Sequence, residues 1–195
     1  MPGQAFCEGV ILAAGASSRI GMFKPALPIG DTTMIGHCIQ GMSEVCQRII
    51  VVGGNEFGKL RLLVEGLANI ECVENSSYQK GMFTSVKTGL SRVHGDRCFV
   101  LPADVPLVPR RVYRHMLTVD KDVIVPAFHG RHGHPVCLSK AILPRILSEP
   151  DESIFRDILR SIGVHALDVD AEEILMDVDT SEDYDLIRQR WSLLQ

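Results

Sequence analysis

Apolar residues lie along the chain in short continuous runs that alternate with longer stretches of helical periodicity. A strand covered on both faces carries such a continuous run, because neither of its faces meets water. The runs of this kind, which predict strands, are Gly9–Leu12, Arg48–Val52, Ile70–Glu74, Cys98–Leu101, Val123–Pro126, Val136–Leu138 and Val164–Val169.

Between most of these runs, apolar residues recur at intervals of three and four positions, which predicts amphipathic helices. The apolar faces fall within residues 34–45, 60–67, 86–93, 112–116 and 154–162. A last helix is expected from about Ser181 to Leu194, because Thr180–Asp183 offers N-capping residues and early acids. The alternation of strand and helix predicts a largely parallel sheet covered on both faces.

The alternation of predicted strands and helices is interrupted between Val123 and Leu138. Two strand-like runs are joined there by Phe128–Pro135, a segment too short for a helical crossover. This stretch predicts a hairpin-like excursion, so the sheet should be mixed. The fold class expected is α/β, in three layers, as one domain over residues 1–195.

Composition and charge limit the partners and the cellular compartment that can be expected. Hydrophobic residues make up 46% and charged residues 23%, as in ordinary globular proteins, and the net charge is −4. This charge gives no general attraction to nucleic acid or to an anionic membrane, so neither is expected as a partner. The six cysteines form no C-x-x-C pair, and Met1–Gln4 has no features of a signal peptide. A cytoplasmic protein with buried thiols is therefore expected.

The segment that follows the first predicted strand is the main candidate for binding phosphates. Small residues from Ala13 to Ser18 would let backbone N–H groups approach anionic oxygens, and Arg19 and Lys24 would balance the charge. The carboxyl end of a strand is where open α/β sheets bind ligands. The spacing differs from a Walker A loop, and an ordinary strand-to-helix turn with solvated cations remains the alternative.

Two acidic segments are candidates for a metal site. Asp104 lies between Pro102 and Pro106 directly after a predicted strand, where the prolines would restrict its backbone. Such a carboxylate suits Mg²⁺, which prefers one or two carboxylates together with water and substrate phosphates. Asp179 offers a second carboxylate. The alternatives are a turn-forming role for Asp104 and capping of the last helix by Asp179 or Thr180.

A loop with three histidines, residues 129–134, raises the question of zinc. No cysteine or acidic residue nearby completes a tetrahedral set, so zinc is disfavoured. Binding of a phosphorylated substrate through His134 and Arg131 is the preferred interpretation, with a simple flexible loop as the alternative.

The segment 79–86 joins a predicted strand to a predicted helix. Gly81 lies near the helix start, and Ser85 supplies a hydroxyl in or near the first turn. These residues could hold a nucleotide base or a phosphate at the helix N-terminus. Capping of the helix explains the hydroxyls of this segment equally well.

Five motifs occur in one order over nearly the full chain. They are Leu12–Gly21 with Lys24, Gly81–Met82 with Ser85, Pro102–Pro106, Gly133–Pro135 and Asp177–Asp183. In this order they resemble the nucleotidyltransferases of molybdenum cofactor maturation, especially the molybdenum cofactor cytidylyltransferases. The resemblance implies a Rossmann-like fold with a mixed sheet. It also implies transfer of a nucleoside monophosphate from an NTP to the terminal phosphate of molybdopterin, with release of pyrophosphate.

The resemblance also implies residue roles and partners. A molybdenum hydroxylase would be a recipient of the modified cofactor, and Mg²⁺ or Mn²⁺ would suit the carboxylates. The roles implied are nucleotide binding by Leu12, Ala13, Ala14, Gly15, Lys24, Gly81 and Ser85, catalysis by Arg19, Lys24 and Asp104, metal binding by Asp104 and Asp179, and acceptor binding by His134 and Arg131.

Ala14 bears on the choice of base, because guanylyltransferase relatives tend to have a second glycine at this place. The additional methyl group would narrow the pocket and favour CTP over GTP. The chain departs from the family pattern at Met22, Phe23 and Phe83, which are bulkier than expected. These residues could reshape the acceptor side of the site.

No nucleophile triad is visible in the sequence, and the inferred chemistry does not need one. A phosphate monoester has a second pKa of about 6, so the acceptor is itself an anionic nucleophile near neutral pH. Alignment and charge stabilisation by Mg²⁺, Arg19 and Lys24 could then suffice. The alternatives are transfer to a sugar or alditol phosphate, and a non-catalytic carrier of molybdenum cofactor.

Overall fold

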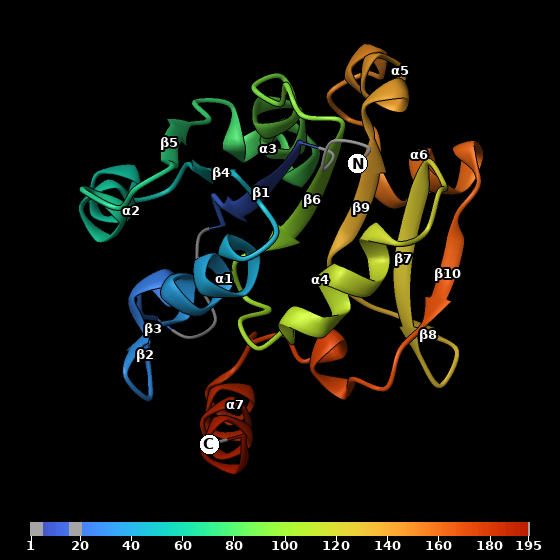
Figure 1. Ribbon diagram of the computed structural model, residues 1–195. Coiled ribbons are helices and arrows are strands. Elements are labelled where there is room, and N and C mark those ends of the chain that lie inside the picture. Colours follow the sequence, from blue (N-terminus) through green and yellow to red (C-terminus); the bar gives the residue numbers. More distant parts are fainter. Residues whose placement is uncertain (1–5, 16–20, 195) are drawn as a thin grey trace.

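The computed structural model describes residues 6–15 and 21–194, and its centre is a mixed β-sheet (Figure 1). The order along the sheet is β10-β7-β9-β6-β1-β4-β5, and the short β8 pairs with β7. Neighbouring strands among β6, β1, β4 and β5 are parallel, whereas β9 is antiparallel to both β6 and β7. The bounds are β1 Cys7–Ala13, β4 Arg48–Gly53, β5 Ile70–Glu74, β6 Arg97–Pro102, β7 Val123–Phe128, β8 Arg131–His132, β9 Val136–Ser139 and β10 His165–Asp168.

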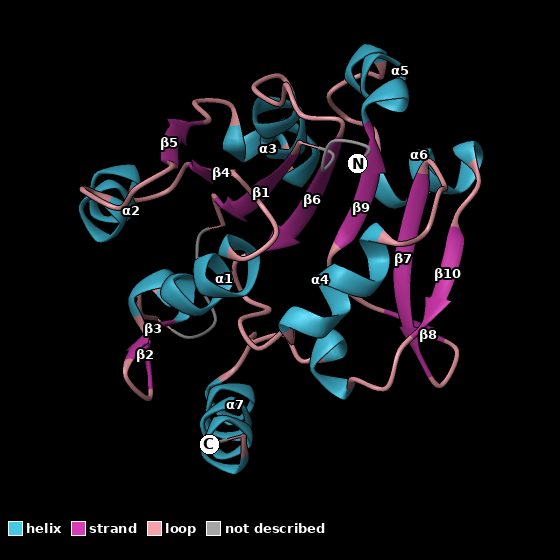
Figure 2. Cartoon of the chain, in the orientation of Figure 1, coloured by secondary structure: helices cyan, strands magenta, loops and turns pink. Residues whose placement is uncertain are grey.

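Helices cover both faces of this sheet (Figure 2). Along β1, Ile11 packs into one core while its neighbour Val10 packs into the other, as the alternation of side chains in a strand requires. Helices α1, α2 and α4 supply the first core, and α3, α5 and α6 supply the second. Their bounds are α1 Met34–Ser43, α2 Phe57–Val64, α3 Met82–Leu90, α4 Arg110–Leu117, α5 Leu143–Ser148 and α6 Phe155–Ile162.

A third, smaller core joins the last helix, α7 (Ser181–Leu193), to a hairpin of β2 (Pro28–Ile29) and β3 (Thr32–Thr33). The ring of Trp191 lies 4.3 Å from that of His37. Thr180 and Asp183 form a capping box at the start of α7, with the Asp183 carboxylate accepting from the Thr180 backbone N–H at 2.8 Å. The structure thus assigns the capping role to Thr180 and not to Asp179.

The predicted strands are all present, and the mixed three-layer architecture is confirmed. The helix α5 and the hairpin β2–β3 were not predicted, because neither is long enough to show a hydrophobic period. Five of the six cysteines are buried and Cys72 is half-buried, and all are free thiols. No helix in residues 6–15 and 21–194 is both long enough and apolar enough to cross a membrane.

A buried carboxylate fixes the start of β1. Glu8 is fully buried and accepts from Arg48 Nη1 at 2.6 Å and from the backbone N–H groups of His94 and Gly95 at 2.5 and 2.6 Å. Burying a charge is tolerated only with such partners. Glu8 therefore ties β1 to β4 and to the turn before β6.

Glu8→Ala is expected to lower the free energy of unfolding by about 3 kcal/mol, because it leaves Arg48 and two N–H groups without their buried acceptor. Urea unfolding followed by circular dichroism measures this loss. The exposed Glu65→Ala is the control, expected to change stability by less than about 0.5 kcal/mol. Equal stabilities for the two variants would contradict the role given to Glu8.

Candidate functional site

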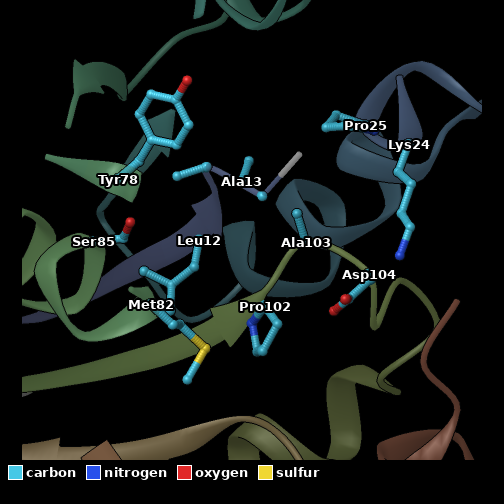
Figure 3. A pocket seen from close by; sticks show the side chains of 12 residues that line it. Leu12, Ala13, Lys24, Pro25, Tyr78, Met82, Ser85, Pro102, Ala103 and Asp104 are labelled. Carbon is cyan, nitrogen blue, oxygen red and sulfur yellow. The ribbon is translucent and has the colours of Figure 1, made fainter. Parts of the chain in front are cut away.

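A cavity of about 280 Å³ opens where β1 and β6 end at the same edge of the sheet (Figure 3). The strands are paired in parallel with Leu12 opposite Pro102, and the Ala103 backbone N–H donates to the Leu12 carbonyl at 2.9 Å. The residues that line the cavity are Leu12, Ala13, Ala14, Gly15, Lys24, Pro25, Tyr78, Met82, Ser85, Pro102, Ala103 and Asp104.

The end of β1 and the two residues after it form one wall of this cavity. Leu12, Ala13, Ala14 and Gly15 all line it. Among the described residues, no atom beyond its chain neighbours lies within 4 Å of a Cβ built on Gly15. Small side chains here leave the backbone accessible to a ligand. The predicted catalytic residue Arg19 lies in residues 16–20, outside the described residues.

Tyr78 forms the facing wall, and its position depends on two small residues. A Cβ built on Gly54 would lie 2.6 Å from Tyr78 Cβ and 3.0 Å from Ala14 Cβ. The tyrosine therefore packs directly over Gly54 and beside Ala14.

Lys24 and Asp104 lie together at the other end of the cavity (Figure 3). Lys24 begins the short helix η1 (Lys24–Ala26), where Pro25 fixes the backbone, and its Nζ donates to Asp179 Oδ1 at 2.9 Å. Asp179 follows Val178, whose backbone N–H donates to the Asp104 carbonyl at 2.9 Å. The structure thus brings Lys24, Asp104 and Asp179 together from three separate segments.

The electrostatics of this end disfavour an isolated negative charge on Asp104. Burial raises the pKa of Asp104 above its usual range, and the ammonium of Lys24 opposes that effect. The negative charges of Asp177 and Asp179 raise the same pKa further. In the described part of the chain, no three His, Cys, Asp or Glu side chains are arranged to hold a metal by themselves. Two carboxylates with room for ligand oxygens are the donor set that Mg²⁺ accepts.

The start of α3 forms the rest of the wall. Gly81 has a φ of 126°, a conformation that favours glycine, and it precedes Met82 and Ser85, which line the cavity. The hydroxyls of this turn do not cap the helix, since α3 has no side-chain capping bond. Phe83, which was expected to reshape the acceptor side, is buried and stacks on Phe155, 6.2 Å between centroids.

The predicted acceptor residues lie apart from this cavity. His134 packs against η4 (Glu172–Leu175), with its backbone N–H donating to the Ile174 carbonyl at 2.9 Å. Burial lowers the pKa of His134, and the nearby Asp177 opposes that shift. Asp177 is thus close enough to act on the His134 ring, although neither residue lines the cavity. Arg131 is exposed in β8 and does not line the cavity.

Several lining residues were not predicted from the sequence. Tyr78 and Met82 are the most informative, because an aromatic ring and a thioether face the cavity opposite small residues. Tyr78 was recognisable as the single aromatic residue in a polar segment just before Gly81. Pro25, Pro102 and Ala103 complete the cavity as neighbours of predicted residues.

Comparison with known proteins gives consistent matches. The sequence model described as "MobA-like NTP transferase domain" matches residues 9–167. The chain is 30% identical over 184 residues to the molybdenum cofactor cytidylyltransferase of Escherichia coli, covering 94% of this chain and 96% of that protein. It is 24% identical over 198 residues to a probable molybdenum cofactor guanylyltransferase of Carboxydothermus hydrogenoformans, covering 94% and 95%.

Solved structures show the same fold. The crystal structure of Rv0371c from Mycobacterium tuberculosis superposes with a TM-score of 0.84 at 25% identity, over 95% of this chain and 98% of that one. A second structure of Rv0371c, in complex with manganese, has a TM-score of 0.79 at 23% identity, over 94% and 98%.

Gly54→Ala is expected to lower the free energy of unfolding by roughly 1–3 kcal/mol, because the new methyl group must displace Tyr78. The near-ultraviolet circular dichroism of the tyrosine should change with it. Gly58→Ala, in open space on α2, is the matched control and should stabilise the protein by up to about 1 kcal/mol. If both variants behave alike, Tyr78 is not held over Gly54.

Proposed function

The chain belongs to the MobA-like NTP transferase family, and on that basis we propose that it transfers CMP from CTP to the terminal phosphate of molybdopterin, releasing pyrophosphate. The observation that carries this proposal is the two-ended cavity. Lys24 and Asp104 lie at one end, and Tyr78, Ala14 and Ser85 form the other.

The triphosphate of CTP is assigned to the end with Lys24. There the small residues Ala13 and Gly15 line the cavity, and the ammonium of Lys24 would neutralise phosphate oxygens. Arg19, which follows in the same segment, is proposed to add a second positive charge. The base is assigned to the wall of Leu12, Tyr78 and Ser85, with Gly81 proposed to shape the turn before Met82. The methyl group of Ala14 is proposed to narrow the cavity there in favour of a pyrimidine.

Mg²⁺ is proposed to bind Asp104 and Asp179, whose hard oxygens and mutual repulsion fit a divalent cation. When bound, the metal would neutralise charge on the phosphate oxygens. Asp104 holds its place because the neighbouring prolines and the Val178–Asp104 backbone bond restrict the segment. Lys24 is held beside it by Asp179.

The proposed reaction requires the acceptor phosphate to be aligned with the α-phosphorus of CTP and the negative charge on the phosphates to be stabilised. An oxygen of the acceptor phosphate attacks the α-phosphorus of CTP, forming a new phosphorus–oxygen bond in line with the departing pyrophosphate. The bond between the α-phosphorus and the bridging oxygen breaks, and its electron pair leaves with pyrophosphate. The acceptor is already an anion, so no residue has to remove a proton. Lys24 stabilises the charge on the phosphates. His134 and Arg131 are proposed to face the acceptor.

The proposal is tested by measuring pyrophosphate release with Mg²⁺ and molybdopterin, offering CTP, GTP, ATP and UTP in parallel. Release with CTP alone is expected. Release with GTP alone would overturn the role given to Ala14 but keep the reaction. Release only with a sugar or alditol phosphate as acceptor, or cofactor binding without any release, would overturn the proposed function.

Asp104→Ala is expected to reduce turnover at least about a hundredfold, because it removes the main metal ligand from a charge-stabilised reaction. The thermal midpoint should not fall, since the buried carboxylate has a raised pKa and is itself costly. Asp157→Ala, an exposed carboxylate on α6, is the control and should keep full activity. Near-normal turnover of Asp104→Ala with Mg²⁺ would contradict the metal assignment.

A further inference from the structure

Asn75 is a buried polar residue for which the proposed chemistry has no role. It follows β5 at the start of the turn that carries Tyr78, and only 4% of its surface is exposed. Its backbone N–H donates to the Gly53 carbonyl at 2.7 Å, which anchors the turn to the end of β4. Its backbone carbonyl accepts from the Tyr78 N–H at 3.3 Å. Asn75 therefore fixes the segment on which Tyr78 stands.

The side-chain amide of Asn75 has a fixed orientation. Its Oδ1 accepts from the Ser77 backbone N–H at 2.9 Å, and a backbone N–H can only donate. The other end must then be the NH₂ group. It donates to Thr84 Oγ1 at 2.8 Å and to Ser85 Oγ at 2.9 Å. Both amide hydrogens are used on two neighbouring hydroxyls of α3.

The hydroxyls of Thr84 and Ser85 differ in the acceptors to which they donate. Thr84 Oγ1 donates back to the Gly81 carbonyl at 2.8 Å, within 3.2 Å of the Ser77 carbonyl as well. Ser85 would ordinarily donate to the carbonyl four residues earlier, which is also Gly81. Thr84 donates to that same carbonyl. In residues 6–15 and 21–194, no hydrogen bond donated by Ser85 is found, and Ser85 lines the cavity (Figure 3).

We propose that Asn75 is a positioning residue for the nucleobase, which it serves by presenting the Ser85 hydroxyl as a hydrogen-bond donor to the cavity. Since the lone pair of Ser85 that faces Asn75 is occupied by a donor, its proton turns toward the ligand. Cytosine offers two adjacent acceptors, O2 and N3, to such a donor. Asn75 also holds the Tyr78 turn against the same base. The inference rests on the proposed function.

The test compares affinity for CTP with affinity for inorganic tripolyphosphate, measured by calorimetry with Mg²⁺ and no acceptor. Tripolyphosphate uses the Lys24 end of the cavity but has no base. Ser85→Ala and Asn75→Ala are each expected to weaken CTP binding roughly tenfold. Both variants should bind tripolyphosphate with an affinity within about twofold of that of the unmodified protein. The double variant should bind CTP no more weakly than Asn75→Ala, because Asn75 acts on the base through Ser85 and the Tyr78 turn.

Thr84→Val is the matched control, because Asn75 donates to Thr84 as it does to Ser85, yet the Thr84 hydroxyl donates its own proton to backbone carbonyls and Thr84 does not line the cavity. This variant should keep CTP affinity within about twofold. If Asn75→Ala does not fold, Asn75→Asp replaces it, because a carboxylate keeps the acceptor for the Ser77 N–H but removes the donor to Ser85.

Three results would overturn the inference: equal losses for Ser85→Ala and Thr84→Val, equal losses of CTP and tripolyphosphate affinity, or fully additive effects in the double variant. A failure of the proposed function would give a different result from a failure of this inference. If the protein does not use CTP, the unmodified protein would bind tripolyphosphate but would not bind CTP in preference to other nucleotides.

Discussion

The parallel pairing of β1 with β6 is the constraint on which the site depends. Both strands are buried on each face, so their apolar residues fix them in the middle of the sheet. In parallel strands the carboxyl ends meet at one edge, and the Ala103–Leu12 backbone bond continues the pairing beyond the strands. The small-residue segment after β1 and the Asp104 segment after β6 therefore face the same cavity.

The cavity has two chemically different ends because different elements complete it. The hairpin β2–β3 and α7 share a small core, and the adjoining segments bring Lys24 and Asp179 beside Asp104. At the other end, the turn after β5 and the first turn of α3 bring Tyr78 and Ser85 together through Asn75. Charge is thus gathered at one end, and an aromatic ring with a hydroxyl at the other. This division fits a ligand with an anionic tail and a planar, polar head.

The sequence predicted the sheet well because its strands are continuous apolar runs. It also pointed to Leu12–Gly15, Lys24 and Asp104, which the fold brings to one cavity, because small residues and a carboxylate follow those runs directly. The partnership of Lys24 with Asp179 was not visible, since 155 residues separate them. Asn75 was missed for a similar reason: a lone asparagine in a polar segment usually signals a turn, and only the folded α3 reveals its two hydroxyl partners. Phe83 looked like part of the site because sequence spacing does not show that its ring points into the core.

The most direct test of the central claim is a crystal structure with Mn²⁺ and a non-hydrolysable CTP analogue, with the metal located by its anomalous scattering. The account predicts a single metal peak bonded to an Asp104 carboxylate oxygen and to phosphate oxygens, with the base beside Tyr78 and Ser85. A metal peak away from Asp104, or an analogue bound outside the cavity between β1 and β6, would contradict it.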